Sequence, residues 1–446
     1  MGTGTLRALS LVILLIMSTA LPCLMRVHAE APKILQFTLS LGKELLKDVE
    51  KSVGTGMNVL VLSNAKYVIV EHQTMYGILI PFIEAGFYPY HNLIPVHTPY
   101  YADLWVFAYN REAHRALYVE LNRSILEKGV AMVLSGQSVS KAVSYVLREG
   151  LIKMRVFSYD PRKIIELGMR DPKRVWLALS SNTSSYAAFS IVTMSLAWSL
   201  GAPSDLFLAA EFHNHVCPGL LSGYMIYEYL DKHSLINPRA EIYIIAEPVW
   251  CKDDLYAVLY DATPGKRRIV VKLIPRAEVE KLMKMLGADP AGAIIVSMHH
   301  KTVNKVIVVA FNFTLLRKLA HIPSSLYHGW GWWVRKLLED EAMLKALKHP
   351  EEFVKVVKVV VFKGRHGRYP GIFYRVAEVG GDLYKVLGLI KPTSTVSRPY
   401  RVVTTTKYVT RTVVYVPTAY RYGMWIFLGL AVGLAIALGI AIARRR

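Results

Sequence analysis

The distribution of apolar and polar residues divides the chain into two apolar ends and a body of mixed helical and extended segments. Residues 9–24 and 422–443 are long apolar runs, and shorter patterned segments fill the sequence between them. Helical periodicity covers residues 31–52, whereas β-branched or alternating runs such as 57–63 and 353–362 predict strands. The pattern therefore predicts an α+β body between two apolar termini.

The two apolar ends predict export and membrane anchoring. Residues 9–24, followed by the small-residue pattern at 27–29, are typical of a signal peptide over residues 1–29, with an uncleaved anchor as the alternative. Residues 421–446 predict a single transmembrane helix with a cytoplasmic tail, because the apolar run is long enough to cross a bilayer and ends in Arg444–Arg446. We expect a single-pass protein of the cell membrane, with its N-terminal body outside and its C-terminus in the cytoplasm.

The basic charge of the chain bears on its partners. The formal net charge is +21, but the Lys and Arg residues are dispersed, without a basic run flanked by stacking aromatic residues. Since the ends also predict export, we expect no nucleic-acid partner. A basic exterior favours acidic partners in the cell envelope instead.

One short stretch concentrates residues that bind metals or act as nucleophiles. In Phe212–Leu220, which is Phe-His-Asn-His-Val-Cys-Pro-Gly-Leu, His213, His215 and Cys217 stand at alternate positions, and an extended backbone would place all three on one face. Imidazole nitrogen and thiolate sulfur are ligands of zinc and of other divalent transition metals. The Pro-Gly pair predicts a helix start, whose free N–H groups stabilise a thiolate.

A second cysteine follows this motif. Cys251 lies in Cys-Lys-Asp-Asp, where Asp254 begins an apolar segment that we interpret as a strand, and the turn Pro264–Lys266 comes next. Loss of the leader removes Cys23 and leaves two cysteines. Two cysteines outside a cell often form a disulfide, which is the alternative to a shared metal site.

The order His-x-His-x-Cys-Pro-Gly, helix, strand, Cys-x-Asp-Asp, strand, Pro-Gly-Lys resembles the FmdE domain family, which takes its name from formylmethanofuran dehydrogenase. The resemblance implies an α+β core with a metal near the His/Cys motif. It also implies roles for six residues: a metal cluster with Asp254 beside it and Lys266 in a cofactor-binding turn. The implied metal ligands are His213, His215, Cys217 and Cys251.

This sequence also departs from the pattern of that family. Asn214 stands where the family usually has glycine, and no Cys-x-x-Cys tail for a zinc ribbon is present. The sequence has no iron–sulfur cysteine set, so we predict no dehydrogenase. The resemblance and the basic, Val- and Tyr-rich composition together indicate an archaeal source.

The order of segments before the motif is similar to the order after it, which predicts two tandem FmdE-like α+β units. We expect a degenerate unit over residues 30–200, a complete unit over 201–390, and a Thr/Val/Pro stalk over 391–420. Two unrelated domains are the alternative.

Our sequence alignment of the two units pairs three segments. It sets residues 77–79 against 219–221, 103–109 against 254–260 and 116–121 against 269–273. It places Met75 at the position of Cys217, and Tyr100 at that of Cys251.

Three functions are compatible with these residues. The first is a membrane-anchored metal-binding protein that handles zinc or another divalent transition metal, or a cofactor. The second is a metal- or cysteine-dependent hydrolase of an unknown small molecule, with Cys217, His215 and Asp254 as catalytic residues. The third is an envelope protein clamped by a disulfide. His299–His300 and the aromatic segment 327–333 are more often structural than functional.

Overall fold

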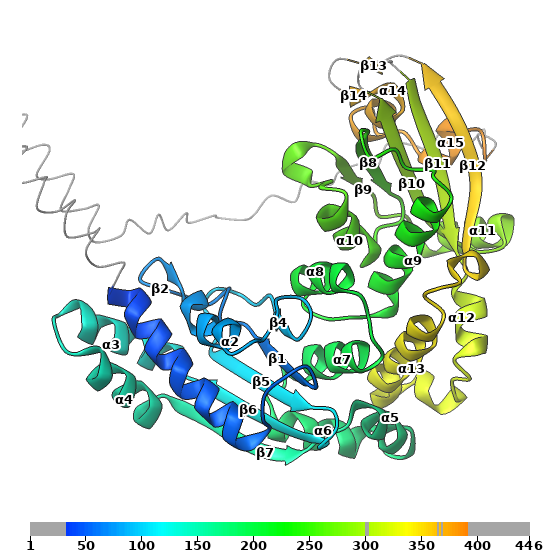
Figure 1. Cartoon of the computed structure of the whole chain (residues 1–446). Coiled ribbons are helices and arrows are strands. Elements are labelled where there is room, and N and C mark those ends of the chain that lie inside the picture. The colour runs from blue at the N-terminus through cyan, green and yellow to red at the C-terminus, as the bar shows by residue number, and fades with distance from the viewer. Residues whose placement is uncertain (1–32, 299–302, 364, 367–368, 391–446) are drawn as a thin grey trace, which may run out of the picture. The chain divides into compact units, whose positions relative to one another are not determined.

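Two five-stranded mixed sheets organise the protein (Figure 1). The computed structural model describes residues 33–298, 303–363, 365–366 and 369–390, which belong to one compact unit ending at Lys391. The first sheet has the order β4-β1-β5-β6-β7 and the second β9-β8-β10-β11-β12. The strands of the first are β1 Val59–Ser63, β4 Leu93–Pro95, β5 Leu104–Asn110, β6 Arg115–Leu121 and β7 Leu151–Ser158. Those of the second are β8 Glu241–Ala246, β9 Ile269–Val271, β10 Asp289–Met298, β11 Val303–Phe311 and β12 Val354–Lys363.

Helices carry most of the remaining chain. One helix covers residues 33–52. The others are α2 Ile80–Glu84, α3 Arg123–Leu134, α4 Val139–Glu149, α5 Pro161–Arg170, α6 Pro172–Asn182, α7 Ala188–Ser199, α8 Ser204–His213, α9 Pro218–Lys232, α10 Lys252–Leu259, α11 Arg276–Leu286, α12 Phe313–Leu319, α13 Trp332–Lys345, α14 Gly371–Ala377 and α15 Leu383–Val386. Short elements are β2 Ile69–Val70, β3 Gln73–Thr74, β13 Arg365–His366, β14 Tyr369–Pro370 and the 3-10 helices Met75–Leu79, Pro264–Lys266, Ser324–Tyr327, Gly329–Gly331 and Pro350–Glu352.

The central strands of each sheet are buried on both faces, because alternate strand residues enter different cores. On β1, Val59 and Val61 pack with the helix over 33–52 and with α3 and α4, whereas Leu60 and Leu62 face a central core. This central core also receives Ile244 of β8, so residues from both sheets share it with α7, α8 and α9. The other face of the second sheet packs against α11 and α14.

The two sheets have the same strand directions. The edge pairs β4–β1 and β9–β8 are parallel, and every other neighbouring pair is antiparallel. Along the chain, both sheets follow one order of elements, which is helix, strand, helix, parallel edge strand, hairpin, helices and final strand, except that the second has the additional helix α11 between β9 and β10. The helix over 33–52 thus takes the place of α9, and β7 takes the place of β12.

Close glycine contacts fix this correspondence residue by residue. Gly42 abuts the backbone of Ile78, and Gly223 of α9 abuts the backbone of Lys252 in the same way. A second contact repeats as well. Gly77 abuts Thr38 of the helix over 33–52, and Cys251 abuts Gly219 of α9, so Thr38 corresponds to Gly219 and Gly77 to Cys251. Counting from these contacts, Gln36 stands at the position of Cys217 and Gly77 at that of Cys251.

The sequence alignment of the two units was therefore wrong in its register. Residues 254–260 lie largely in helix α10 and not in a strand, so they do not correspond to β5. Residues 269–271 form the parallel edge strand β9, whose counterpart is β4 and not β6. The short apolar run after Asp254 suits either element, and periodicity alone does not distinguish them.

Other predictions about elements are confirmed. The helical pattern at 31–52 forms a helix over 33–52, the run at 353–362 forms β12, and the chain is mixed α+β. The signal peptide, the stalk, the transmembrane helix and His299–His300 lie outside the described residues. Among the helices that the structure does describe, none has the length and apolar character needed to span a bilayer.

Candidate metal centre

The motif His213–Cys217 is a tight connection between two helices, and the expected extended backbone is wrong. His213 is the last residue of α8, and Cys217 caps the N-terminus of α9, where its Sγ accepts a hydrogen bond from the Leu220 N–H at 3.5 Å. Between them Asn214 has a φ of 63°, in the left-handed region that Gly and Asn tolerate best. Asparagine can therefore serve where the family usually has glycine.

The three motif side chains converge because this turn folds back on itself. The ligand atoms of His213, His215 and Cys217 all lie within 4.8 Å of one another, and the two imidazole rings are 4.4 Å apart between centroids. The Nε2 atom of His213 lies 3.6 Å from the Sγ atom of Cys217. These donors are nitrogen and sulfur, the set that zinc and similar metals prefer.

Asp254 fixes the orientation of the first imidazole. Asp254 belongs to the first turn of α10, and its Oδ2 atom lies 2.7 Å from Nδ1 of His213. Because Nδ1 is engaged by the carboxylate, Nε2 is directed towards Cys217. Histidine ligands of metal ions are commonly held by a carboxylate in this manner.

Cys251, which precedes α10, brings the second thiol to the centre. It lies close enough to Cys217 and to His213 for both to lower the pKa of its thiol. A Cβ atom on Gly219 would lie only 3.0 Å from the Cys251 Sγ, so the glycine of the Pro-Gly pair leaves room for the thiol. Both cysteines are free, and the structure therefore contains no Cys217–Cys251 disulfide.

The charges in the centre are coupled. The hydrogen bond with Cys217 lowers the pKa of Cys251 to about 4 despite burial, and His213 acts in the same direction. Burial opposes a charge on His213, but hydrogen bonds with Asp254 and Cys251 raise its pKa to about 9. Burial and the adjacent charge of His213 lower the pKa of His215 to about 3. A neutral His215 beside a thiolate is a suitable pair of donors for a cation.

The structure adds an acidic residue that the sequence analysis missed. Asp340 of α13 is fully buried, and neither carboxylate oxygen has a hydrogen-bond partner among the described residues. Burial raises its pKa well above the ordinary value, and its charge interacts with those of Cys217 and Cys251. In sequence, Glu339–Glu341 is an acidic run on a helix, which usually indicates a solvated face, so no local signal marked Asp340.

Aromatic residues flank the second imidazole. The ring of Phe189 lies 5.0 Å from that of His215 and 5.3 Å from that of Trp332, between centroids. Trp332 belongs to the aromatic segment 327–333, and it also packs against Trp176. This segment therefore contributes to the surroundings of His215.

Two further contacts define the limits of the centre. Lys266 is exposed and pairs with Asp261, and no contact among the described residues connects it to the His/Cys group. Glu211, two residues before His213 on α8, is buried and accepts hydrogen bonds from Lys66 Nζ at 2.7 Å and Tyr67 OH at 2.5 Å. The turn that follows β1 thus holds the helix that ends in the first candidate ligand.

The fold and this site define an α+β protein with a His/Cys centre that can hold a metal ion. Residues 212–323 match the FmdE family, which is described as "FmdE, Molybdenum formylmethanofuran dehydrogenase operon", and this part of the chain is an FmdE domain. The domain includes the two histidines, both cysteines and Asp254, but it ends before Asp340. No curated protein matches the sequence.

Proposed function

We propose that this protein is a membrane-anchored FmdE-domain protein that binds zinc or another divalent transition metal outside the cytoplasm and handles it for the cell envelope. One observation carries the proposal: two imidazoles and a thiol from one helix connection converge within 4.8 Å, with Asp254 orienting His213. His213, His215, Cys217 and Cys251 would hold the ion. A bound ion would supply positive charge to the thiolates, and Lewis acidity if a coordination position stays open.

The anchoring part of the proposal is supported by the sequence. The apolar run with its terminal arginines suits a single-pass helix, and the apolar N-terminal run suits a leader. Protease treatment of intact cells would test it. Digestion of the body in intact cells, with the C-terminal tail protected, is expected; complete protection of the body would contradict export.

The metal is tested by elemental analysis of full-length protein purified without chelator and without a nickel column. We expect about one metal ion per chain, and thiols that react with a maleimide only after chelation. Cys217→Ser and His213→Ala should each lose most of the metal. Asp261→Asn is the matched control, because Asp261 lies in the same domain and pairs only at the surface with Lys266 and Arg268. A folded Cys217→Ser protein with unchanged metal content would refute the proposal.

A cysteine hydrolase is a second candidate, and a specific arrangement favours it. Asp254, His213 and Cys217 form a continuous chain of hydrogen bonds, in which a carboxylate orients an imidazole that engages a thiol. Activated nucleophiles use this order of groups. The geometry thus favours Cys217 with His213 for this chemistry, where the sequence had indicated Cys217 with His215.

Turnover of an ester panel separates the two candidates. A cysteine hydrolase is expected to act on esters after metal removal and to lose activity in Cys217→Ser. A metal-handling protein is expected to show no turnover in either form, while Cys217→Ser loses most of its metal.

We also infer that the two sheets descend from one duplicated α+β unit. The identical strand order and the matching glycine contacts support this inference. Since Gln36 and Gly77 stand where the second unit has its cysteines, the first unit has no thiol at the equivalent place. The inference therefore agrees with one metal ion per chain, and two would contradict it.

A further inference from the structure

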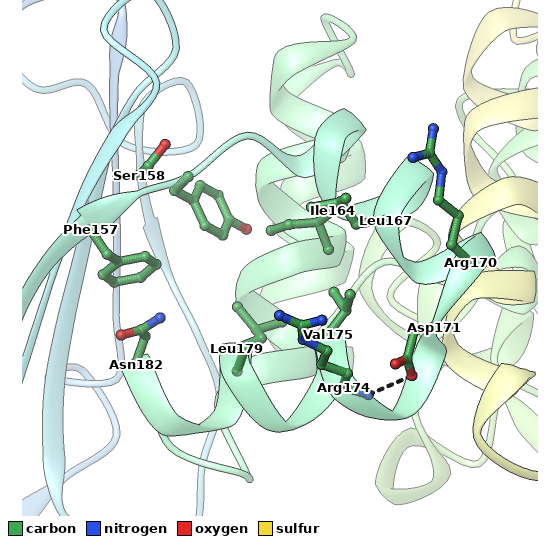
Figure 2. A pocket seen from close by; sticks show the side chains of 12 residues that line it. Phe157, Ser158, Ile164, Leu167, Arg170, Asp171, Arg174, Val175, Leu179 and Asn182 are labelled. Atoms are coloured by element: carbon green, nitrogen blue, oxygen red, sulfur yellow. Dashed lines mark hydrogen bonds between the residues drawn. The ribbon is translucent and has the colours of Figure 1, made fainter.

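A cavity in the first unit has the features of a binding site for a small molecule (Figure 2). It lies between the edge strand β7 and the helices α5 and α6, and its volume is about 450 Å³. Apolar side chains from all three elements form most of its lining: Phe157, Ile164, Leu167, Val175 and Leu179. Cavities of this size commonly accept small organic ligands.

Local sequence explains why the cavity is built from these helices. α5 and α6 each begin with an aspartate cap followed by proline, at Asp160 and at Asp171, so the chain turns sharply between them. β7 is the last strand of its sheet, and the lining residue Phe157 packs against Tyr159. The Tyr159 hydroxyl bonds Ser195 at 2.6 Å, so the core satisfies the polar group of this lining residue.

Arg174 gives the cavity a positive charge that can pair with an anionic ligand. The Arg174 guanidinium lies beside Val175 and Leu179 on the cavity side of α6, whereas Arg170 extends away (Figure 2). Arg170 already pairs with Glu166 at 3.0 Å. Arg174 forms no ion pair within the part of the chain that the structure describes. Asp171 also lines the cavity, but it accepts the Arg174 backbone N–H at 3.0 Å as the helix cap.

We propose that this cavity binds a single-chain amphiphile with an anionic head group. The apolar lining takes the hydrocarbon chain, the Arg174 guanidinium pairs with a carboxylate or a phosphate, and the Asn182 amide at the rim supplies a further polar contact. All lining residues lie between positions 157 and 182, outside the FmdE domain and apart from the candidate metal ligands. The site is thus independent of the proposed metal function.

Calorimetric titration of the full-length protein tests the proposal with octanoate, octyl phosphate and octanol. Octanoate should bind saturably. It should also bind more tightly than hexanoate, by a factor of about four for each additional CH2 group. Octanol, which lacks the charge, should bind about tenfold more weakly than the better anion. If octyl phosphate binds more tightly than octanoate, the natural ligand has a phosphorylated head group. If octanoate binds more tightly, the head group is a carboxylate.

Two variants locate the site. Arg174→Gln should weaken anion binding about tenfold and leave octanol binding unchanged, and Ala178→Phe should abolish both by filling the cavity. The matched controls are Lys173→Gln and Leu177→Phe, which change the same helix at positions that do not line the cavity. Circular dichroism establishes that each variant is folded. No saturable anion binding, equal binding of octanol and the anions, or unchanged binding in a folded Arg174→Gln or Ala178→Phe protein would overturn the proposal.

Discussion

At the scale of single residues, the buried carboxyl group of Asp340 is the most unusual feature of the centre. A fully buried carboxylate without hydrogen bonds costs free energy of folding, because water no longer solvates its charge. Burial raises the pKa of Asp340 in the folded state above its ordinary value of 3.8. The folded protein therefore holds a proton that the unfolded chain releases.

Asp340 should consequently make the metal-free protein less stable as the pH rises. Its contribution is most favourable below pH 3.8 and is progressively lost as the pH rises towards the folded-state pKa. We expect Asp340→Asn to stabilise the metal-free protein at pH 7 by about 1–3 kcal/mol relative to the wild type, with a smaller effect at pH 4. Urea unfolding at both pH values measures this, and Glu341→Gln, on the same helix, is the control. Equal stability of wild type and Asp340→Asn at pH 7 would show that the carboxyl group is compensated in the folded protein.

Gly219 governs the approach of the second thiol. A Cβ atom at this position would lie 2.9 Å from Cβ and 3.0 Å from Sγ of Cys251. We expect Gly219→Ala to displace this thiol and to weaken zinc binding about tenfold, measured by competition with a chromophoric chelator. Gly265→Ala in the same domain, where the added atom meets nothing within 4 Å, should bind zinc as the wild type does. Unchanged affinity in Gly219→Ala would remove Cys251 from the set of ligands.

At the scale of elements, one helix contact occurs twice. α9 approaches α10 at Gly223, where a Cβ atom would lie 2.9 Å from the Lys252 Cα, and the helix over 33–52 approaches Ile78 at Gly42. Since the opposing atoms are backbone, we expect Gly223→Ala and Gly42→Ala each to destabilise the protein by about 1–3 kcal/mol. Chemical unfolding measures the loss, and Gly371→Ala, whose added atom has open space, should be neutral. An unchanged free energy of unfolding in Gly42→Ala, with a loss in Gly223→Ala, would show that the backbone around Ile78 shifts to accept the added methyl group.

Prediction from sequence succeeded where a segment was long or chemically distinctive. The helix over 33–52 and strand β12 follow from periodicity, and the His213–Cys217 motif marks the centre by residue type. The segment after Cys251 was misassigned because eight residues that end in five apolar positions suit a strand or a helix. That error and the pairing of residues 77–79 with 219–221 together shifted the register between the two units.

Asp340 was unpredictable for another reason. It comes from α13, far along the chain from the motif, and only tertiary packing brings its charge to the thiols. The cavity beside β7 is likewise a product of packing, because none of its residues forms a recognisable motif. Sequence patterns report on neighbours along the chain, and these features depend on neighbours in space.

At the scale of the whole molecule, the shared central core couples the two units. Residues from both sheets pack in it, so we expect one cooperative unfolding transition for the described part of the chain. Zinc at a hundred times its Kd should raise the free energy of unfolding of this single transition by about 2.7 kcal/mol. Scanning calorimetry with and without chelator measures this. Two transitions, of which only one responds to zinc, would show that the units unfold separately.

The buried Glu211 gives this coupling a consequence for how the chain can evolve. Lys66 and Tyr67 belong to the unit without thiols, yet they hold a carboxylate two residues before the first candidate ligand. A descendant that deleted this unit would leave the charge of Glu211 without its partners at the edge of the centre. Under the duplication that we infer, selection on the candidate metal centre would therefore also preserve the unit without thiols, because that unit holds the helix that carries His213.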